Sequence, residues 1–425
     1  MADNSSLSSA RKAKNDEFYT QYSDIEAEMN AYVEYDPDVF RGKTILLPCD
    51  DPEWSNFTKY FAANFERFGL KKLISTSYAK GAGNRQMTLF ELESPLFDES
   101  KHETHGKLFT LTSDTDGSGM VDTDDIEFSG YLNGDGDFRS AEVKKLRDEA
   151  DIIITNPPFS LFREFLAWIV EADKKFIIMG NKNAITYKEV FPLLMGNRMW
   201  VGYTSLNGGR WMILPKDIDV RSTKAKDDGN GNLILNVAGV CWFTNIEHGK
   251  RHEKMILDTM AHNLKFNKKL KKKLEKDYGK VEYPHYDNYD AIEVPFTECI
   301  PSDYDGVMGV PITFMDKYNP DQFEIVAFRK GDDGKDLVFT REREREFNRT
   351  FASLYDVDSR DDKERRRKDK WAAYLRKNNN HPQKTPVEVI FPLSTNLQNG
   401  LINDCTIGGK KTYVRMLIRK QKGGN

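Results

Sequence analysis

The stretch DIIITNPPF, residues 151–159, decides the fold of this 425-residue chain. Its three isoleucines and threonine form a short β-branched run, which is typical of a strand buried on both faces. The strand stops at Asn156, and Pro157 and Pro158 follow. Prolines fix φ and remove N–H donors, so the carbonyls of this loop are held in place and left unpaired. Because ligands bind at the carboxyl ends of strands in open α/β sheets, we expect a ligand-binding loop here.

The Asn-Pro-Pro-Phe loop offers a specific chemistry to a planar amine. The side-chain oxygen of Asn156 and the main-chain carbonyl of Pro157 are two acceptors for the two hydrogens of an exocyclic NH2 group. In an aromatic amine the nitrogen lone pair is delocalised into the ring, and these two hydrogen bonds would localise it on the nitrogen. Phe159 would stack on the ring that carries the amine. Asparagine carries no titratable proton, so the loop works by alignment and electrostatics without a general base. Taken alone, the tetrapeptide also fits a proline-rich turn after any strand.

NPPF after a buried strand resembles motif IV of the S-adenosylmethionine-dependent N6-adenine DNA methyltransferases. The resemblance implies that Asn156, Pro157, Pro158 and Phe159 are the catalytic residues and that S-adenosylmethionine is the cofactor. It also implies an α/β, Rossmann-like methyltransferase fold, with a mostly parallel, doubly wound sheet and a C-terminal target-recognition region. The encoding genome is then bacterial or that of a phage.

Composition sets broad limits on the class of protein. A chain of 425 residues suits two domains, and 39% apolar content is enough for a large core. The formal charge of -4 does not indicate a nucleic-acid partner, so any basic surface that binds one must be local. The four cysteines form no CxxC pair, which argues against a disulfide framework and a zinc site. No apolar run reaches membrane-spanning length, so we expect a cytoplasmic protein without a membrane partner.

Residues 44–47 read as a first strand, followed by the acidic loop PCDDPEWSNF. A phosphate-binding turn would carry glycines, and this loop has none. S-adenosylmethionine has no phosphate, and its ammonium and sulfonium groups favour carboxylates such as Asp50 and Asp51. A capped, solvated loop is the alternative. The CDDP-x-x-SNF arrangement resembles motif I of the EcoRI-type adenine methyltransferase family, which implies that Pro48, Cys49, Asp50 and Asp51 contact the cofactor.

An extended aromatic segment, Phe18, Tyr19 and Thr20, precedes the first expected helix. One interpretation is an N-terminal strap packed on the core. The other is that the segment resembles motif X of the same enzymes, which lines the cofactor pocket ahead of the first strand. Its position before a Rossmann-like half favours the second interpretation.

Two further positions are candidates for the cofactor site. The second strand, residues 73–76, ends at Ser77. A Rossmann-like site often has an acid here that holds the ribose hydroxyls of its ligand, and this sequence offers only hydroxyl groups. GDGDFRSAEVKKL resembles motif III, which implies that Asp137 and Phe138 hold the cofactor's adenine. Asp135 is an alternative acceptor, and a simple polar turn remains an alternative for the whole stretch.

An acidic insertion covers about residues 80–128. Within it, the loop from Asp114 to Asp125 matches a calcium-loop spacing, but its flanks read as strands and its last ligand is Asp where Glu is usual. We therefore expect a β-hairpin with an acidic turn and no metal site.

The sequence suggests three parts: a cofactor-pocket segment at 1–40, a catalytic domain at 41–246 and a recognition region at 247–425, with an arginine-rich insertion at about 340–380. Residues 265–280 contain eight lysines against two acids. This stretch fits a solvated helix and a phosphate-contacting one equally well.

The linear order of the motifs is that of gamma-class amino methyltransferases. It predicts a site-specific enzyme that methylates N6 of an adenine flipped out of double-stranded DNA. We expect a monomer, with a cognate restriction endonuclease, where one exists, acting separately. Two alternatives stay open: a protein glutamine N5-methyltransferase, which also uses an Asn-Pro-Pro-aromatic loop, and a non-catalytic DNA-binding protein on a decayed methyltransferase fold.

Overall fold

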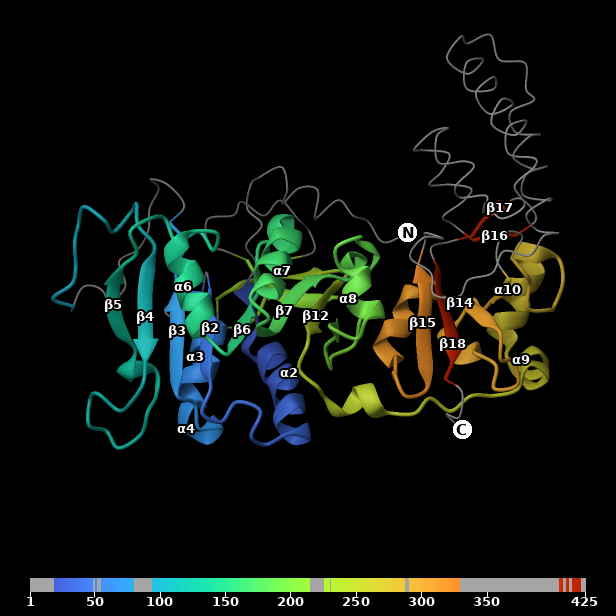
Figure 1. The fold of residues 1–425 in the computed structure, drawn as a ribbon, viewed down its shortest axis with the longest axis horizontal. Coiled ribbons are helices and arrows are strands. Elements are labelled where there is room, and N and C mark those ends of the chain that lie inside the picture. The colour runs from blue at the N-terminus through green and yellow to red at the C-terminus, as the bar shows by residue number, and fades with distance from the viewer. Residues whose placement is uncertain are drawn as a thin grey trace, which may run out of the picture. The chain divides into compact units, whose positions relative to one another are not determined.

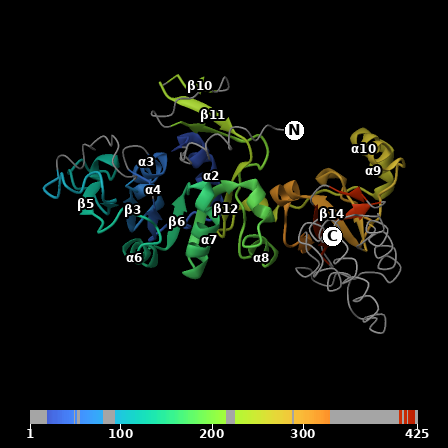
Figure 2. The ribbon, with the colours of Figure 1, turned by 90° about the horizontal axis from the view of Figure 1, so that it is seen from above.

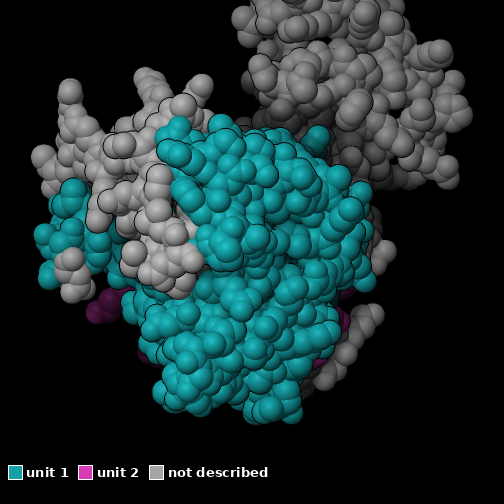
Figure 3. Space-filling view, turned by 90° about the vertical axis from the view of Figure 1, so that its left-hand side faces the viewer, with its two compact units in different colours: residues 1–251 teal, residues 252–425 magenta. Residues whose placement is uncertain are grey.

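The computed structural model describes residues 19–48, 50–51, 55–79, 94–214, 225–229, 231–286, 290–328, 405–407, 410–412 and 415–421. The chain divides into two compact units, residues 1–251 and 252–425 (Figure 3). Phe18, Cys49 and the arginine-rich insertion lie outside the described residues.

Unit 1 is built on an eight-stranded sheet of order β5-β4-β3-β2-β6-β7-β12-β8 (Figure 1). Its strands are β2 (Thr44–Leu47), β3 (Lys72–Thr76), β4 (Lys107–Leu111), β5 (Glu127–Tyr131), β6 (Ile152–Thr155), β7 (Lys175–Asn181), β8 (Trp200–Val201) and β12 (Val240–Thr244). The four central strands, β3, β2, β6 and β7, are parallel neighbours. The pairings outside them, β3 with β4, β4 with β5, β7 with β12 and β12 with β8, are antiparallel. The sheet is therefore mixed, with a parallel centre, and the expectation of a mostly parallel sheet is wrong. The hairpin β4-β5 adds antiparallel pairings at one end, and β12 lies antiparallel between β7 and β8 at the other.

Helices cover both faces of this sheet. Figure 2 shows α2 (Tyr22–Tyr35), α3 (Asn56–Ala63) and α4 (Phe65–Phe68) on one side of the strands. The other side carries α6 (Ala141–Glu149), α7 (Phe162–Glu171) and α8 (Phe191–Met195). Every residue of β2 and of β6 is buried, which explains why both strands are continuous apolar runs. The α/β layering expected from the sequence is present.

Smaller elements complete unit 1. A second sheet has the order β1-β9-β11-β10, from β1 (Tyr19–Thr20), β9 (Arg210–Ile213), β11 (Leu233–Val237) and β10 (Lys226–Asp227). Short 3-10 helices cover Thr123–Asp125, Phe159–Leu161 and Lys182–Thr186, and a fourth, Gly249–His252, includes the first residue of unit 2. Ser140 caps α6 by accepting a hydrogen bond from the Val143 N–H, as its position predicts.

Unit 2 contains a four-stranded sheet of order β13-β14-β18-β15, from β13 (Ala291–Glu293), β14 (Val307–Pro311), β18 (Arg415–Lys420) and β15 (Phe323–Phe328). Its other elements are the helices α9 (Met260–Phe266) and α10 (Lys268–Tyr278), the two-stranded pair β16 (Thr406–Ile407) and β17 (Lys410–Lys411), and 3-10 turns at Thr297–Cys299 and Ile312–Lys317. A buried ion pair between Glu293 and Arg415, 2.6 Å long, ties β13 to β18. Among the described helices of either unit, none is long and apolar enough to cross a membrane.

Candidate active site

The candidate site lies where β2 and β6 end. The chain runs from β2 to β3 on one side and then returns to β6 on the other side of β2, so the strand order switches between β2 and β6. Ile45 pairs with Ile152 and Leu46 with Ile153, in parallel, so the two strands end at the same edge. In open α/β sheets such a switch point is where ligands bind.

Asp50, just beyond β2, is the centre of a buried hydrogen-bond network. Thr155 at the end of β6 donates to one carboxylate oxygen at 2.6 Å, and Ser55 donates to the other at 2.7 Å. The main-chain carbonyl of Asp50 accepts hydrogen bonds from the hydroxyls of Ser75 on β3 and Thr58 on α3. We call Ser55, Thr58, Ser75 and Thr155 the hydroxyl cluster. It fixes the loop after β2 to β3, β6 and α3 together.

The hydroxyl cluster has an electrostatic consequence. Its donors are neutral hydroxyls, which fix the position of the Asp50 carboxyl group by hydrogen bonds. Asp50 is only 9% exposed, and a charge in such surroundings acts more strongly on a neighbouring cation than it would in water. Asp51, which is half-buried, accepts a hydrogen bond from the Ser55 N–H through its carbonyl, at 2.7 Å. The arrangement favours a cationic ligand at this edge.

The NPPF loop continues directly from Thr155. Asn156 is half-buried with its side-chain oxygen inside, and Pro157 is buried. The carbonyl of Pro158 accepts a hydrogen bond from the Leu161 N–H at 2.9 Å, which begins a 3-10 turn. Within the described part of the chain, the Pro157 carbonyl accepts no hydrogen bond. The Pro157 carbonyl is therefore available to a ligand, as expected. The expectation that the carbonyls of this loop are unpaired is wrong for Pro158, because the chain turns at once into the 3-10 helix.

Phe159 is half-buried and packs against the main core of unit 1 on one side. A ring that is fixed on one side and only partly covered can serve as a stacking platform. Phe162, in contrast, is buried and packs on Phe243 of β12, with ring centroids 5.4 Å apart. The aromatic stripe of α7 thus belongs to the core, as its helical spacing predicts.

The N-terminal strap reaches the same region. Tyr19 and Thr20 form β1, which pairs with β9 in the second sheet. The Thr20 hydroxyl lies 3.0 Å from the Met179 sulfur on β7, and the Thr20 carbonyl accepts a hydrogen bond from the Asn56 amide on α3 at 2.7 Å. Thr20 is therefore held beside α3 and β7. The pocket-lining role predicted for Tyr19 and Thr20 stays a prediction.

Ser77 directly follows β3, and its N–H and hydroxyl are both hydrogen-bonded to the neighbouring backbone. Its N–H donates to the Lys107 carbonyl at 3.0 Å, and its hydroxyl accepts from the Lys107 N–H at 3.1 Å. Gly136 has a φ of +85°, and any Cβ there would collide with the Ser77 carbonyl. The Ala79 N–H donates to the Asp135 carbonyl at 2.6 Å. The structure therefore brings the GDGD loop against the end of β3.

Asp137 and Phe138, expected to hold the cofactor's adenine, have other partners as well. The Arg139 guanidinium holds the Asp137 carboxylate at 2.6 and 2.9 Å, and this bonding lowers the pKa of Asp137 below its usual range. The Phe138 ring is buried against Phe165 and Trp168 on α7, with centroids 5.1 and 5.6 Å away. The loop is near the site edge, but Phe138 is a core residue in this arrangement. The adenine-binding role of the pair remains a prediction.

Sequence reasoning missed the hydroxyl cluster. The sequence pattern indicates only a buried strand at Thr155 and gives Ser75 no special role. The available signal was a hydroxyl at or next to the last position of two buried strands, where an apolar residue would otherwise be expected. Ser55 carried a second signal, because it precedes α3 and caps it by accepting from the Phe57 N–H at 3.1 Å.

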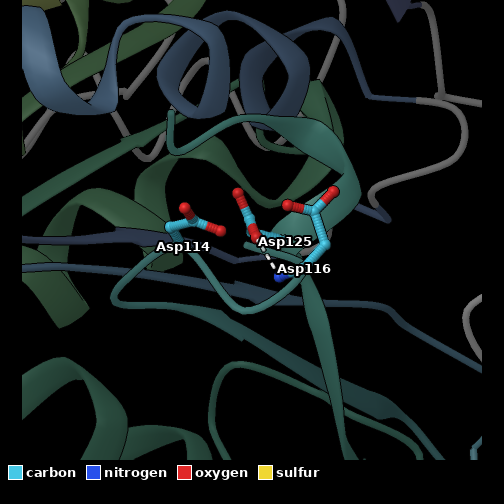
Figure 4. A group of neighbouring side chains, drawn as sticks. All are labelled: Asp114, Asp116 and Asp125. Carbon is cyan, nitrogen blue, oxygen red and sulfur yellow. Dashed lines mark hydrogen bonds between the residues drawn. The ribbon is translucent and has the colours of Figure 1, made fainter. Parts of the chain in front are cut away.

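The acidic loop between β4 and β5 brings three carboxylates together (Figure 4). Oxygen atoms of Asp114, Asp116 and Asp125 lie within 4.8 Å of one another. β4 and β5 pair antiparallel, so the predicted hairpin with an acidic turn is confirmed. Strands flank this loop on both sides, whereas a calcium loop of this spacing lies between two helices.

Backbone groups of the same loop already satisfy these carboxylates. Asp125 accepts from the Thr115 N–H at 2.6 Å and from the Asp122 N–H at 2.9 Å. Asp114 accepts from the N–H groups of Gly117 and Gly119 at 2.6 and 2.8 Å. Burial opposes ionisation of Asp125, but these hydrogen bonds outweigh it and lower its pKa. The loop's own turn geometry thus accounts for the cluster.

The sequence profile of the family described as "Adenine-specific methyltransferase EcoRI" matches residues 6–421. The chain belongs to this family. It is 43% identical to the type II methyltransferase M.EcoRI of Escherichia coli over 79% of the chain and 93% of that protein. No solved structure matches the chain. The resemblance first seen in the CDDP and NPPF motifs of this adenine-specific methyltransferase is therefore confirmed.

Two further relatives come from mycoplasmas. The type II methyltransferase M.MgeORF184P of Mycoplasma genitalium is 34% identical over 75% of the chain and 84% of its own length. The type II methyltransferase M.MpnI of Mycoplasma pneumoniae is 32% identical over 75% of the chain and 83% of its own length. Membership of an adenine-specific family favours an adenine enzyme over a protein glutamine methyltransferase and over a non-catalytic DNA-binding protein.

Proposed function

We propose that this protein is a site-specific DNA methyltransferase that transfers a methyl group from S-adenosylmethionine to N6 of adenine in double-stranded DNA. The 2.6 Å hydrogen bond from Thr155 to the Asp50 carboxylate carries the proposal. It joins the strand that leads into Asn156 to the acidic loop after β2. Two ligand groups bound at these loops would meet at one edge of the sheet, where the strand order switches.

The residues at this edge fit S-adenosylmethionine. This cofactor supplies the methyl group from a positively charged sulfonium and carries no phosphate. Asp50 offers a buried carboxyl group that the Ser55 and Thr155 hydroxyls hold in place, and the loop after β2 has no glycine with which to cradle a phosphate. We assign the cofactor site to Tyr19, Thr20, Pro48, Asp50 and Asp51, with Phe18, Cys49, Ser77, Asp137 and Phe138 as the further predicted contacts.

The NPPF loop orients the adenine amine. The side-chain oxygen of Asn156 and the carbonyl of Pro157 accept the two N6 hydrogens, so that the nitrogen lone pair points toward the cofactor side of the site. Pro158 holds the loop rigid, and Phe159 stacks on the base. No residue of the loop removes a proton in the transfer step, since Asn156 has no titratable group at working pH, and the proton that N6 loses on methylation passes to solvent.

A stacked adenine cannot reach such a site, so the protein must flip it out of the duplex. Unstacking costs a few kcal/mol, which stacking on Phe159 partly offsets. We assign residues 41–246 to a Rossmann-like catalytic domain, residues 1–40 to a cofactor-pocket segment and residues 247–425 to DNA target recognition. The parallel centre of the sheet and its switch point support the Rossmann-like assignment. We further propose a cytoplasmic monomer, with any cognate endonuclease acting separately.

Methylation of a mixed-sequence DNA library tests the proposal. The full chain is incubated with the library and S-adenosylmethionine labelled in its methyl group, and N6-methyladenine is mapped. We expect label on adenine within one short sequence motif. Label on protein glutamine, or DNA binding without transfer at saturating cofactor, would overturn the proposal.

A further inference from the structure

Helix α10 presents a line of lysines away from the body of unit 2. Leu270 and Leu274 are fully buried and fix which face of α10 points inward. Lys268, Lys272 and Lys276 recur every four residues, so they lie one above the other along the opposite face. All three are exposed. We call these three residues the lysine line.

The lysine line lacks acidic partners, unlike its neighbours on the same helix. Lys273 pairs with Asp277 at 2.6 Å and Lys269 lies 3.9 Å from Glu298. In the part of the chain that the structure describes, no carboxylate lies within ion-pair distance of the lysine line. The three charges therefore face solvent together.

This arrangement disfavours the helix itself. Like charges four residues apart destabilise a helix by about 0.2–0.5 kcal/mol per pair. Lys268 and Lys269 also occupy the first turn of α10, which contains no acid, and their charge opposes the helix dipole. A helix selected only for solubility would alternate charges along its outer face. A bound polyanion removes both penalties, which distinguishes this surface from an ordinary solvated helix.

The surface beside the lysine line supports the same partner. Phe266, the last residue of α9, is 57% exposed, and the Lys265 ammonium lies 5.1 Å from the centre of its ring. The His262 ring is 4.4 Å from that of Phe266. Cationic groups interleaved with exposed rings are typical of surfaces that bind nucleic acids.

We propose that the lysine line binds the sugar-phosphate backbone of double-stranded DNA, independently of base sequence. The eight helical steps from Lys268 to Lys276 span about 12 Å, similar to the width of the major groove, so the line can follow phosphates along one groove edge. This inference rests on the proposed function, which identifies double-stranded DNA as the ligand. It adds a docking surface that is separate from the residues that read the bases. Such contacts fix the position of a protein on DNA but carry no sequence information.

Salt-dependent binding of a triple variant tests this surface. Lys268→Gln, Lys272→Gln and Lys276→Gln are combined in the full chain. Dissociation constants are measured between 50 and 300 mM NaCl for two duplexes: one of mixed sequence and one of G·C pairs only, which contains no adenine. Each lost phosphate contact lowers the slope of log K against log salt by about 0.9. We expect a fall of about 2.7 on both duplexes, with kcat at saturating DNA within twofold of the wild type.

Two controls make the result specific. The Lys→Arg triple at the same positions keeps the charge and is expected to keep the slope. The combination of Lys71→Gln, Lys101→Gln and Lys145→Gln changes the net charge equally, through exposed lysines of unit 1, and is expected to change the slope by less than about 0.5. Thermal unfolding checks that each variant is folded.

The inference is overturned if the Gln triple at α10 keeps the wild-type slope, if the unit 1 triple loses as much, or if the wild type does not bind the G·C duplex. These outcomes differ from failure of the proposed function. A wild type that binds the G·C duplex by way of the lysine line but methylates no DNA refutes methyl transfer alone. A wild type that methylates adenine, with an unchanged slope in the triple variant, refutes the docking surface alone.

Discussion

Two buried carboxylates of unit 1, Asp50 and Asp125, are held by different kinds of partners. Asp125 accepts hydrogen bonds from backbone groups no more than ten residues away in its own loop. Asp50 accepts from Ser55 at the start of α3 and from Thr155, 105 residues away on β6. The first carboxylate completes a turn, and the second joins two strands that end at the candidate active site.

This difference separates a carboxylate that stabilises its own loop from one that helps to build the candidate active site. The acidic loop has the more suggestive sequence, yet its carboxylates serve the turn that contains them. The loop after β2 has only two aspartates, but its position beside β6 gives Asp50 a role beyond its own loop. Loss of Asp50 contacts should therefore change ligand binding, whereas loss of Asp125 contacts should change stability.

The largest expected effect is that of Asp50→Asn on cofactor binding. The variant keeps the shape of the side chain and removes a charge from a poorly solvated position. A charge pair about 4 Å apart near a protein surface is worth up to about 4 kcal/mol. We expect the dissociation constant for S-adenosylmethionine, measured by calorimetry, to rise about 100-fold or more. A change below threefold would remove Asp50 from the cofactor site.

A smaller effect is expected at Thr155. Thr155→Val keeps the side-chain shape but removes the 2.6 Å hydrogen bond to Asp50, and a hydrogen bond to a charged group contributes about 1.5–3 kcal/mol. We expect KM for S-adenosylmethionine to rise about tenfold or more, with KM for DNA within twofold. Thr155→Ser retains the hydroxyl and should restore most of the loss. Equal behaviour of the Val and Ser variants would show that packing, and not the hydroxyl, matters.

Asp125→Asn should affect stability alone. The variant replaces an acceptor of several backbone N–H groups and should lower the free energy of unfolding by about 1 kcal/mol. Because the candidate active site lies where β2 and β6 end, away from the loop between β4 and β5, we expect kcat and KM to stay within twofold of the wild type. Denaturant unfolding and methyl-transfer assays on the same sample measure both. If Asp125→Asn kept the wild-type stability but weakened methyl transfer, Asp125 would act in the reaction and not in the stability of its loop.

The pH dependence of that stability difference has a defined sign. The folded-state pKa of Asp125 is lowered, so its carboxylate stabilises the fold above the unfolded pKa, near 3.9. The difference between wild type and Asp125→Asn should therefore be constant above about pH 5 and shrink as the pH falls through the lowered folded pKa. A difference that grows on acidification would contradict the assignment.

The smallest expected effect is that of calcium. Backbone N–H groups already occupy the carboxylates of Asp114 and Asp125, so a cation would have to displace them. We expect the midpoint of thermal unfolding to differ by less than about 1 °C between millimolar calcium chloride and EDTA. A rise of several degrees with calcium that Asp125→Asn abolishes would identify this loop as a cation site.

Local patterns in the sequence predicted local structure well. The bounds of β2, the hairpin around the acidic turn and the Ser140 cap depend on neighbours in the chain, and all three are present. The hydroxyl cluster was not predicted, because it exists only when β3, β2 and β6 lie side by side. Phe138 shows the same limit, since its position next to an aspartate gives no sign that its ring packs on α7. Long-range pairing decides both.

Single-turnover methyl transfer by Asn156→Ala tests the central claim most directly, namely that the cofactor loop and the NPPF loop form one site with separate tasks. The assay uses saturating S-adenosylmethionine and DNA, with cofactor affinity measured in parallel. The account predicts that transfer falls by about 100-fold or more while the cofactor dissociation constant stays within threefold. Transfer at the wild-type rate would contradict the role of Asn156. Loss of cofactor binding together with transfer would contradict the division of tasks.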